Sequence, residues 1–208
     1  MEETSRPIWK NPYVVGFLVG IAMLTVLPVL QRRMLRAPPP LSHLSSWSLP
    51  TLEGGPVGSE SLLGFVWIAG LVPVPCDPSC VSQQQSLQDV LKATSDLARP
   101  VKLLTVVAVE EERRQVPSEL QALSVPGKWS VAYGTYEELA PLQSELRQAL
   151  WAFRGEQARG VPPAVEALPG FVLVDQNGDV RGFWGADELS RGNLINAARM
   201  LNRYGPNP

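Results

Sequence analysis

Residues 65–80 read FVWIAGLVPVPCDPSC and carry the strongest structural signal of the sequence. An apolar run leads into a proline-rich loop that carries the only two cysteines of the chain, Cys76 and Cys80. A polar run over 81–97 follows at once, with leucine and valine at helical spacing. The pattern predicts a strand that delivers two thiols to the N-terminus of a helix. Backbone N–H groups and the helix dipole favour thiolate over thiol at that position.

The composition is that of one globular domain with additional segments. A chain of 208 residues is long enough for a full domain of about 150 residues. The hydrophobic content of 45% and the charged content of 18% are ordinary for a globular protein. A net charge of -2 offers no basic field to meet phosphates, which argues against a nucleic-acid binder. Two cysteines also exclude a framework of many structural disulfides.

An uncharged run from Tyr13 to Leu30 predicts an uncleaved single-pass membrane anchor. Trp9 and Tyr13 stand at one margin of this run and three arginines at the other, as interface anchors do. The run is longer than the apolar region of a signal peptide, and no small-residue cleavage site follows it. We therefore divide the chain into a tail over 1–11, a transmembrane anchor over 12–31, a Pro/Ser-rich tether over 32–46 and a domain over 47–208.

The single histidine, His43, falls in this tether, where we expect a solvated side chain. Beyond the tether, predicted strands alternate with predicted helices. Asn177-Gly178 between two apolar runs is the strongest short-range signal for a β-hairpin. Such alternation implies a mostly parallel sheet, to which the closing hairpin adds an antiparallel edge.

We therefore predict an α/β, thioredoxin-like fold behind the single transmembrane helix. The expected order is a strand into the cysteine loop, a helix over 81–97, a strand over 101–109, a short helix over 118–123, a strand over 129–133, a helix over 136–153, a hairpin over 171–184 and a helix over 189–201.

Two thiols at this spacing have several possible roles. Cysteines four positions apart fall on one side of a helical turn, with Cα atoms near the roughly 6 Å that a disulfide requires. The same geometry lets both thiolates hold one soft cation, above all Cu(I). No lysine or arginine lies between Arg36 and Lys92, so a thiolate has to be stabilised by the helix N-terminus, a metal or groups distant in sequence. A static disulfide and two incidental buried cysteines are the alternatives to a functional pair.

From about Ser48 to Tyr204 the chain resembles the SCO/SenC family, membrane-anchored thioredoxin-fold proteins that assist copper insertion into cytochrome c oxidase. The resemblance is carried by Cys76-Asp-Pro-Ser-Cys80 after an apolar strand, by the Val106–Val109 strand running into an acidic stretch, by Gly134-Thr-Tyr-Glu-Glu-Leu139 and by Phe171-Val-Leu-Val-Asp-Gln-Asn-Gly178 followed by Phe183-Trp-Gly185. It implies that Cys76 and Cys80 are copper ligands or redox thiols, and that the partner is a respiratory oxidase.

The sequence departs from the family pattern at three places. Pro78 lies inside the cysteine loop, and Val81 follows the second cysteine where the family has proline. Glu110-Glu-Glu112 replaces the family's Asp-Pro after the second strand. No histidine lies in Val165-Glu-Ala-Leu-Pro-Gly170, where the family's copper ligand is expected. Glu166 is the nearest polar candidate there, but its carboxylate is hard where Cu(I) is soft, and His43 would reach the cysteines only if the tether folded back.

Leu168-Pro169 before a strand suggests a second comparison. Thioredoxin-like reductases place a cis-proline at this point, beside the cysteines, to receive a substrate peptide. Proline is the residue at which a cis bond costs little. A trans-proline that ends a loop is the alternative.

Three hypotheses of different classes follow. The first is a SCO-like copper-binding assembly factor for a respiratory oxidase, with Cu(I) on Cys76 and Cys80. The second is a membrane-tethered thiol–disulfide oxidoreductase, an enzyme in which Cys76 attacks and Cys80 resolves a mixed disulfide. The third is a non-catalytic subunit or scaffold of a membrane complex, which would tolerate Cys→Ser replacement.

The charges that flank the anchor and the redox chemistry point to opposite topologies. Arg6 and Lys10 precede the anchor and three arginines follow it, which favours a cytoplasmic C-terminal domain by one charge. Copper and disulfide chemistry instead suits an oxidising compartment. We therefore expect an extracytoplasmic domain, on the periplasmic side or in an intermembrane space.

Overall fold

The computed structural model describes residues 12–34, 37–72, 78–111, 116–155, 168 and 170–205. The chain divides into two compact units, Met1–Arg36 and Ala37–Pro208. The first contains helix α1 (Pro12–Met34), along which Tyr13 is 85% and Leu24 77% exposed. Within the described residues, no helix combines the length and the apolarity that a membrane crossing requires. The anchor over 12–31 therefore stays a prediction.

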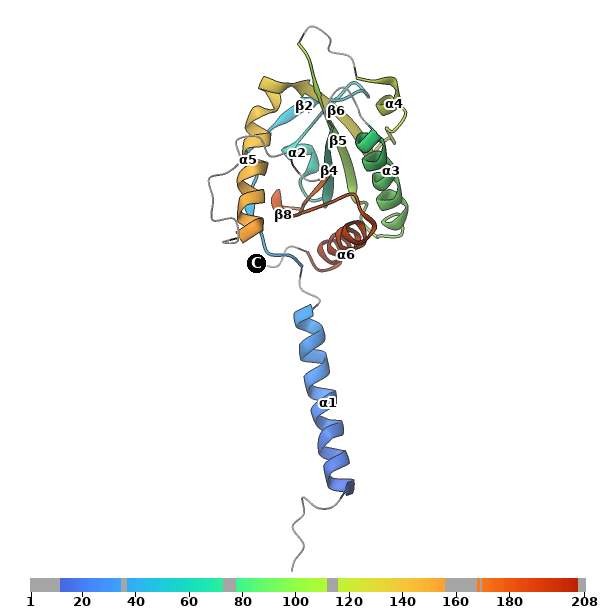
Figure 1. The fold of residues 1–208 in the computed structure, drawn as a ribbon, viewed down its shortest axis with the longest axis vertical. Helices are drawn as coiled ribbons and strands as arrows, with labels where there is room; N and C mark the ends of the chain where they lie inside the picture. The colour runs from blue at the N-terminus through green and yellow to red at the C-terminus, as the bar shows by residue number, and fades with distance from the viewer. Residues whose placement is uncertain are drawn as a thin grey trace, which may run out of the picture. The chain divides into compact units, whose positions relative to one another are not determined.

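In the second unit the described strands form a six-stranded sheet in the order β1-β8-β7-β4-β5-β6, and β2 pairs with β3 in a small separate sheet (Figure 1). The strands are β1 (Ser42–His43), β2 (Ser48–Pro50), β3 (Pro56–Gly58), β4 (Trp67–Val72), β5 (Lys102–Val109), β6 (Trp129–Thr135), β7 (Phe171–Val174) and β8 (Asp179–Trp184). The helices are α2 (Ser59–Leu62), α3 (Pro78–Ala93), α4 (Ser118–Gln121), α5 (Tyr136–Arg154) and α6 (Glu188–Tyr204).

The expectation of a mostly parallel sheet is wrong, because the sheet is mixed. Among the described strands, β4, β5 and β6 run parallel, whereas β7 is antiparallel to β4, β8 to β7 and β1 to β8. The hairpin is the reason, since β7 pairs directly with the central strand β4 and does not extend an edge. The α/β class, the flanking helices and the predicted element order are confirmed.

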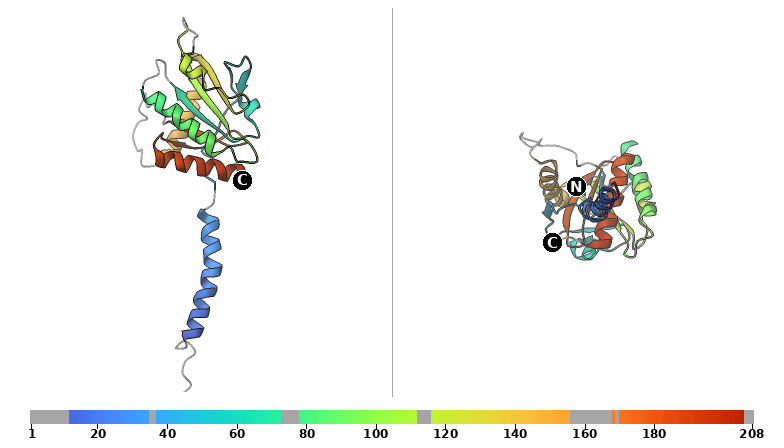
Figure 2. Two further views of the ribbon diagram at one scale, coloured as in Figure 1. Left: turned by 90° about the vertical axis from the view of Figure 1, so that its right-hand side faces the viewer. Right: turned by 90° about the horizontal axis from the view of Figure 1, so that it is seen from below.

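Helices cover both faces of the sheet. Helix α5 packs on one face, and α3 and α6 lie together on the other (Figures 1 and 2). Alternate residues of β5 serve the two faces: Leu104 and Val106 pack with α5, whereas Leu103 packs with α3 and α6. Burial on both faces explains why this strand reads as a continuous apolar run.

The tether assignment is also wrong for residues 37–46. The second compact unit begins at Ala37, and β1 pairs with β8 through Ser42 and His43. Leu44 is buried in the core on the α5 face. The sequence shows no strand pattern here. The two-residue strand forms because it pairs with the edge of β8, a contact that the local sequence does not reveal.

A buried ion pair fixes the hairpin to this N-terminal segment. Asp175 and Arg181 are both almost fully buried, with Arg181 Nε 2.6 Å and Nη2 2.5 Å from Asp175 Oδ2. Asp175 Oδ1 accepts the backbone N–H groups of Asn177 and Asp179, which shapes the predicted turn. Arg181 Nη1 donates to the carbonyl oxygen of Pro38 at 3.0 Å. One arginine therefore holds both the turn and the entry of the chain into the domain.

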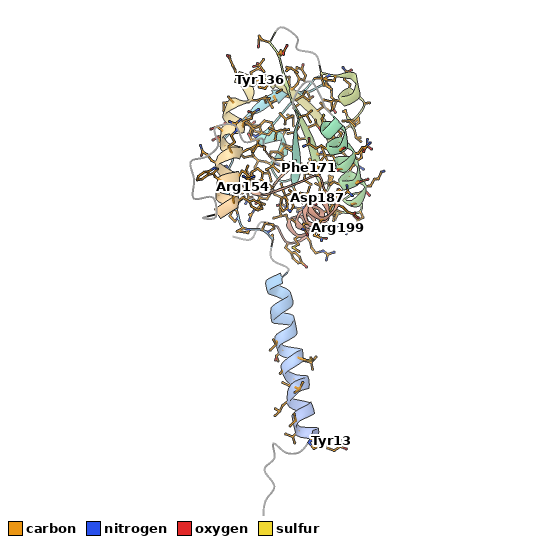
Figure 3. All side chains as sticks on the ribbon, in the orientation of Figure 1. Tyr13, Tyr136, Arg154, Phe171, Asp187 and Arg199 are labelled. Carbon is orange, nitrogen blue, oxygen red and sulfur yellow. The ribbon has the colours of Figure 1, made fainter. Side chains whose placement is uncertain are left out.

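The two long helices that flank the hairpin begin at side-chain caps. Thr135 and Glu138 form a capping box at the start of α5, whose ends Tyr136 and Arg154 are labelled in Figure 3. Asp187 caps α6 and accepts the backbone N–H of Ser190 at 2.9 Å. The hydroxyl and backbone N–H of Ser190 lower the pKa of Asp187 below its usual value. These caps define where each helix leaves the sheet.

Candidate thiol site

Cys80 lies where the central strand β4 gives way to α3. It is the third residue of this helix, which begins at Pro78 and not at Val81 as predicted. Proline suits the first helical position because it lacks an N–H group that would stay unpaired there. Cys80 is disulfide-bonded and only 2% exposed. The one other cysteine of the sequence, Cys76, lies outside the described residues.

The side chain of Cys80 packs on an apolar floor. It belongs to a buried apolar cluster with residues of three parallel strands and of the segment at α4, which include Val72, Val107, Val131 and Leu120. This cluster lies on the sheet face that carries α3. Cys80 is therefore closed off on the side of the domain core.

A second segment comes close to the first turns of α3. Gln83 donates from Nε2 to the carbonyl oxygen of Gly170, immediately before β7. The contact passes over Gly70 of β4, where a Cβ atom would lie 3.3 Å from Gln83 Nε2. Pro169 itself lies outside the described residues, so its predicted cis bond is untested. Its neighbour Gly170 is nevertheless bonded to Gln83, which lies one helical turn after Cys80.

His43 lies at the other end of the sheet. It pairs with Asp179 across β1 and β8. The neighbouring residue of β8 lies opposite the last residue of β7, which in turn lies opposite Trp67, the first residue of β4. Cys80 lies beyond Val72, the last residue of β4, with which it packs. Five residue steps of a strand span about 17 Å. The side chain of His43 is exposed, as expected, but the residue belongs to β1 and not to a tether, and its place in the sheet keeps it away from Cys80.

Among the residues that the structure describes, no other candidate ligand is grouped into a metal site. Glu166 and Glu112 lie outside the described residues. Glu110 and Glu111 are exposed, as expected for a solvated turn after β5. The described parts of the chain contain no group of three or more His, Cys, Asp or Glu side chains arranged to hold a metal ion.

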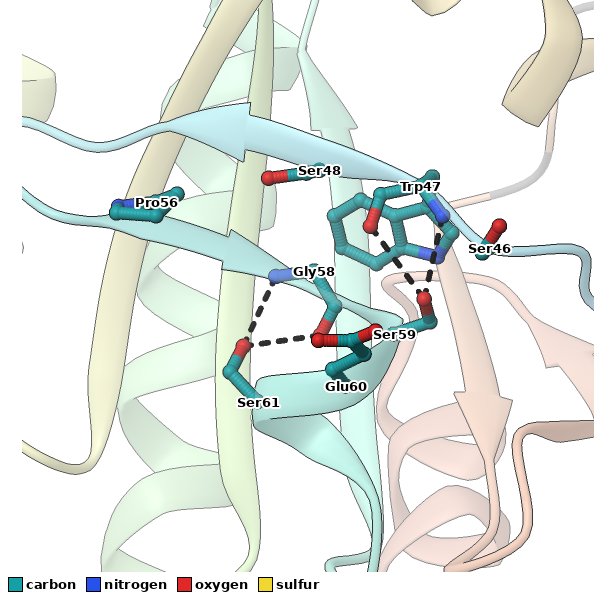
Figure 4. A pocket seen from close by; sticks show the side chains of 8 residues that line it. All are labelled: Ser46, Trp47, Ser48, Pro56, Gly58, Ser59, Glu60 and Ser61. Carbon is teal, nitrogen blue, oxygen red and sulfur yellow. Dashed lines mark hydrogen bonds between the residues drawn. The ribbon is translucent and has the colours of Figure 1, made fainter.

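A surface pocket at β2, β3 and α2 does not add to the thiol site (Figure 4). It is lined by residues 46–48, 56 and 58–61, none of which belongs to α3 or the cysteine loop. Its hydroxyls serve local structure: Ser59 Oγ accepts the N–H of Trp47, and Ser61 Oγ accepts the N–H of Gly58. These bonds hold α2 against the hairpin of β2 and β3.

The sequence did not predict a row of buried polar side chains next to Cys80. Gln84, Thr105 and Trp129 come from α3, β5 and β6, and they are 4%, 0% and 1% exposed. Trp129 Nε1 lies 3.0 Å from Thr105 Oγ1, which lies 3.1 Å from Gln84 Oε1. Two signals were present in the sequence: Gln84 follows Cys80 at helical spacing, and Thr105 interrupts an apolar strand.

Several solved structures have a similar fold. The protein BsSco, described as a Sco-family cytochrome c oxidase assembly protein with a disulfide switch, is 20% identical with a TM-score of 0.56, covering 81% of this chain and 99% of its own. A lipoprotein of the same family from Bacillus anthracis is 19% identical with a TM-score of 0.55, over 78% and 96%. Copper-bound ScoI from Bradyrhizobium japonicum is 19% identical with a TM-score of 0.52, over 77% and 100%.

The fold is that of the Sco proteins. The predicted resemblance is thus confirmed at the level of architecture, and it spans nearly the whole length of these Sco structures. No family model and no curated protein sequence matches the chain. The chain therefore has a Sco fold without a matching family model or curated sequence, and Cys80 lies at the junction between β4 and α3.

Proposed function

We propose that this protein acts in the assembly of a respiratory cytochrome oxidase through the thiol pair Cys76 and Cys80. The observation that carries the proposal is a disulfide-bonded cysteine in the first turn of α3 within a Sco fold. Of the similar Sco structures, BsSco is described as having a disulfide switch, and ScoI from Bradyrhizobium japonicum has copper bound. Both descriptions concern chemistry that two neighbouring thiols can perform.

Copper would be cargo held by the reduced pair. Two thiolates are soft ligands that suit Cu(I), and oxidation of the same thiols to the disulfide removes both ligands. Reduction of the disulfide by a dithiol, which is itself oxidised to a disulfide, would prepare the pair to take up the ion. Exchange with a partner disulfide, which accepts the two electrons and becomes a dithiol, would re-form the protein disulfide and release the ion. The described residues supply no histidine near Cys80, so the pair would bind copper without the neutral third ligand that the family uses.

The position of His43 favours a second candidate, a thiol–disulfide oxidoreductase that needs no copper. In such an exchange one thiolate attacks a substrate disulfide, and the second thiol resolves the mixed disulfide. Cys80 suits the resolving role, because at 2% exposure it is closed to a bulky substrate. Cys76 would then be the attacking thiol, and the segment around Gly170 would flank the substrate.

We place the domain outside the cytoplasm, anchored by α1. Support comes from the uncharged run between Tyr13 and Leu30 and from the exposure of Phe17 and Leu24 along the helix. A disulfide at Cys80 also persists best in an oxidising compartment. Protease treatment of intact cells or spheroplasts tests the topology: cleavage of the domain without lysis is expected, and protection would overturn this placement.

The first experiment is an anaerobic Cu(I) titration of the reduced full-length protein in detergent, against a competing chelator. The Cys76→Ser/Cys80→Ser double variant runs alongside as the matched control. Tight one-to-one binding that the double variant loses supports the copper role. Binding no tighter than that of the double variant would remove copper and leave a thiol oxidoreductase or a non-catalytic scaffold.

A further inference from the structure

The row formed by Gln84, Thr105 and Trp129 has a fixed direction. An indole N–H can only donate, so Trp129 Nε1 donates to Thr105 Oγ1. The hydroxyl of Thr105 then has its own hydrogen left, which it donates to Gln84 Oε1. The Gln84 amide is oriented with its oxygen toward Thr105 and its NH2 group directed elsewhere.

The NH2 group of Gln84 is buried, and no described residue offers it an acceptor. Gln84 Nε2 is shielded from solvent, and the structure gives it no hydrogen-bond partner among the residues it describes. A buried donor left unpaired costs about 1–3 kcal/mol. Such a group in a native core calls for an explanation, and a change of state nearby that supplies an acceptor is one.

Cys80 is the neighbour of Gln84 toward the helix N-terminus. The two residues are four positions apart, so their side chains share one face of α3, and helical side chains lean toward the N-terminus. The order of residues along β5 agrees, because Cys80 belongs to the same buried cluster as Val107, and Gln84 bonds Thr105, two residues earlier on the same face of β5. The Gln84 amide is therefore directed toward the first turn of α3, which carries Cys80.

We propose that the NH2 group of Gln84 donates a hydrogen bond to the sulfur of Cys80 when the disulfide is reduced. This inference rests on the proposed function, since it requires a pair that cycles between two redox states. A reduced sulfur carries more negative charge than a disulfide sulfur and is the better acceptor. The bond stabilises the dithiol form and raises the reduction potential of the pair.

The redox step balances with a dithiol reductant. The protein S–S bond breaks, an S–S bond forms in the reductant, and the reductant supplies two electrons and two protons to the protein sulfurs. The Gln84 amide exchanges no proton or electron in this step. Its effect is confined to the relative free energies of the disulfide and dithiol forms.

The test measures the reduction potential of the metal-free, full-length protein in detergent with a chelator present. The protein is equilibrated with reduced and oxidised dithiothreitol, quenched in acid, alkylated and analysed by mass spectrometry. Gln84→Met keeps the side-chain length and helix propensity but removes the donor. We expect the equilibrium to move about tenfold toward the disulfide, which corresponds to about 30 mV for a two-electron couple.

Two controls separate the donor from general effects on the core. Gln176 is also buried and has an unpaired side-chain oxygen, but it bonds Leu201 at the C-terminal end of α6. Gln176→Met should leave the potential unchanged. Thr105→Val removes the anchor of the amide but keeps its NH2 group, so it should lower stability with a smaller shift in potential than Gln84→Met.

The outcomes distinguish this inference from the proposed function. A wild-type disulfide that dithiothreitol does not reduce would overturn both. A reducible pair whose potential in Gln84→Met stays within twofold of the wild-type equilibrium would overturn the inference alone. Equal shifts in Gln84→Met and Thr105→Val would also overturn it, because they would indicate a general packing effect.

Discussion

His43 and Asp179 face each other across β1 and β8, with His43 Nδ1 2.9 Å from Asp179 Oδ1. The pair lies beside Gly178, at the turn of the hairpin, where a Cβ atom would contact the imidazole at 3.5 Å. The single histidine of the chain is thereby committed to the end of the sheet that Cys80 does not occupy. Copper bound at Cys80 would therefore be held without this imidazole.

The first prediction concerns this histidine. His43→Ala should leave the Cu(I) affinity of the reduced full-length protein within about twofold of wild type, because its imidazole is held roughly a β4 length from Cys80. The chelator competition described above measures it, with the Cys76→Ser/Cys80→Ser variant as the control that loses binding. A tenfold loss in His43→Ala would show that the histidine reaches the metal and that the sheet register misplaces it.

The second prediction concerns the buried pair of Arg181 and Asp175. Arg181→Met leaves the Asp175 carboxylate buried without its cation, and breaking such a pair costs about 3–5 kcal/mol. Urea unfolding should report that loss in the free energy of unfolding. Arg191→Met is the matched control: Arg191 pairs with half-exposed Asp89 at 3.5 Å, and removing a surface pair costs about 1 kcal/mol or less. Equal losses in the two variants would contradict the account.

The third prediction concerns Gly70. A Cβ atom there would lie 3.3 Å from Gln83 Nε2 and 3.4 Å from Leu87 Cδ1, so Gly70→Ala should displace the amide that holds Gly170. Overpacking of this kind costs about 1–3 kcal/mol. The cost should shrink in a Gln83→Ala background, where the amide is absent. A double-mutant cycle measures this coupling, and strictly additive losses would show that Gln83 and Gly70 do not interact.

The sequence predicted the elements that depend on local pattern. The apolar run before the cysteines is β4, the Asn177-Gly178 signal is the turn between β7 and β8, and the helix predicted over 136–153 is α5. Each of these rests on neighbouring residues alone: an uncharged run, a turn dipeptide that tolerates φ of +88° at Gly178, and apolar residues at helical spacing. Local chemistry of this kind can be read without knowing what packs against it.

Features that depend on distant partners were missed. β1 exists because the edge of β8 accepts two residues that show no strand pattern, and the mixed sheet follows from β7 pairing with β4. Gln84 reads as a solvated helix residue until Thr105 is placed opposite it. Tertiary contact, and not propensity, decides all three. Cys80 was found because two cysteines in a proline loop at a strand end are distinctive by themselves.

The fourth prediction concerns the pH dependence that Asp187 contributes. Hydrogen bonds from the hydroxyl and backbone N–H of Ser190 hold its pKa below the usual value of 3.8. A carboxylate whose folded-state pKa is depressed stabilises the protein above the unfolded-state value, and this contribution disappears as the pH falls through the lower, folded-state value. Asp187→Asn keeps an acceptor for the cap but removes the charge.

The small deficit in stability of Asp187→Asn at pH 7 should therefore shrink below about pH 4 and vanish at lower pH. Thermal unfolding followed by circular dichroism across this range measures it, with Asp187→Ala as a control that lacks the cap oxygen. If the stability deficit of Asp187→Asn stays constant down to pH 2, the charge of Asp187 does not contribute to stability. The start of α6 would then be stabilised by the hydrogen-bond acceptor alone.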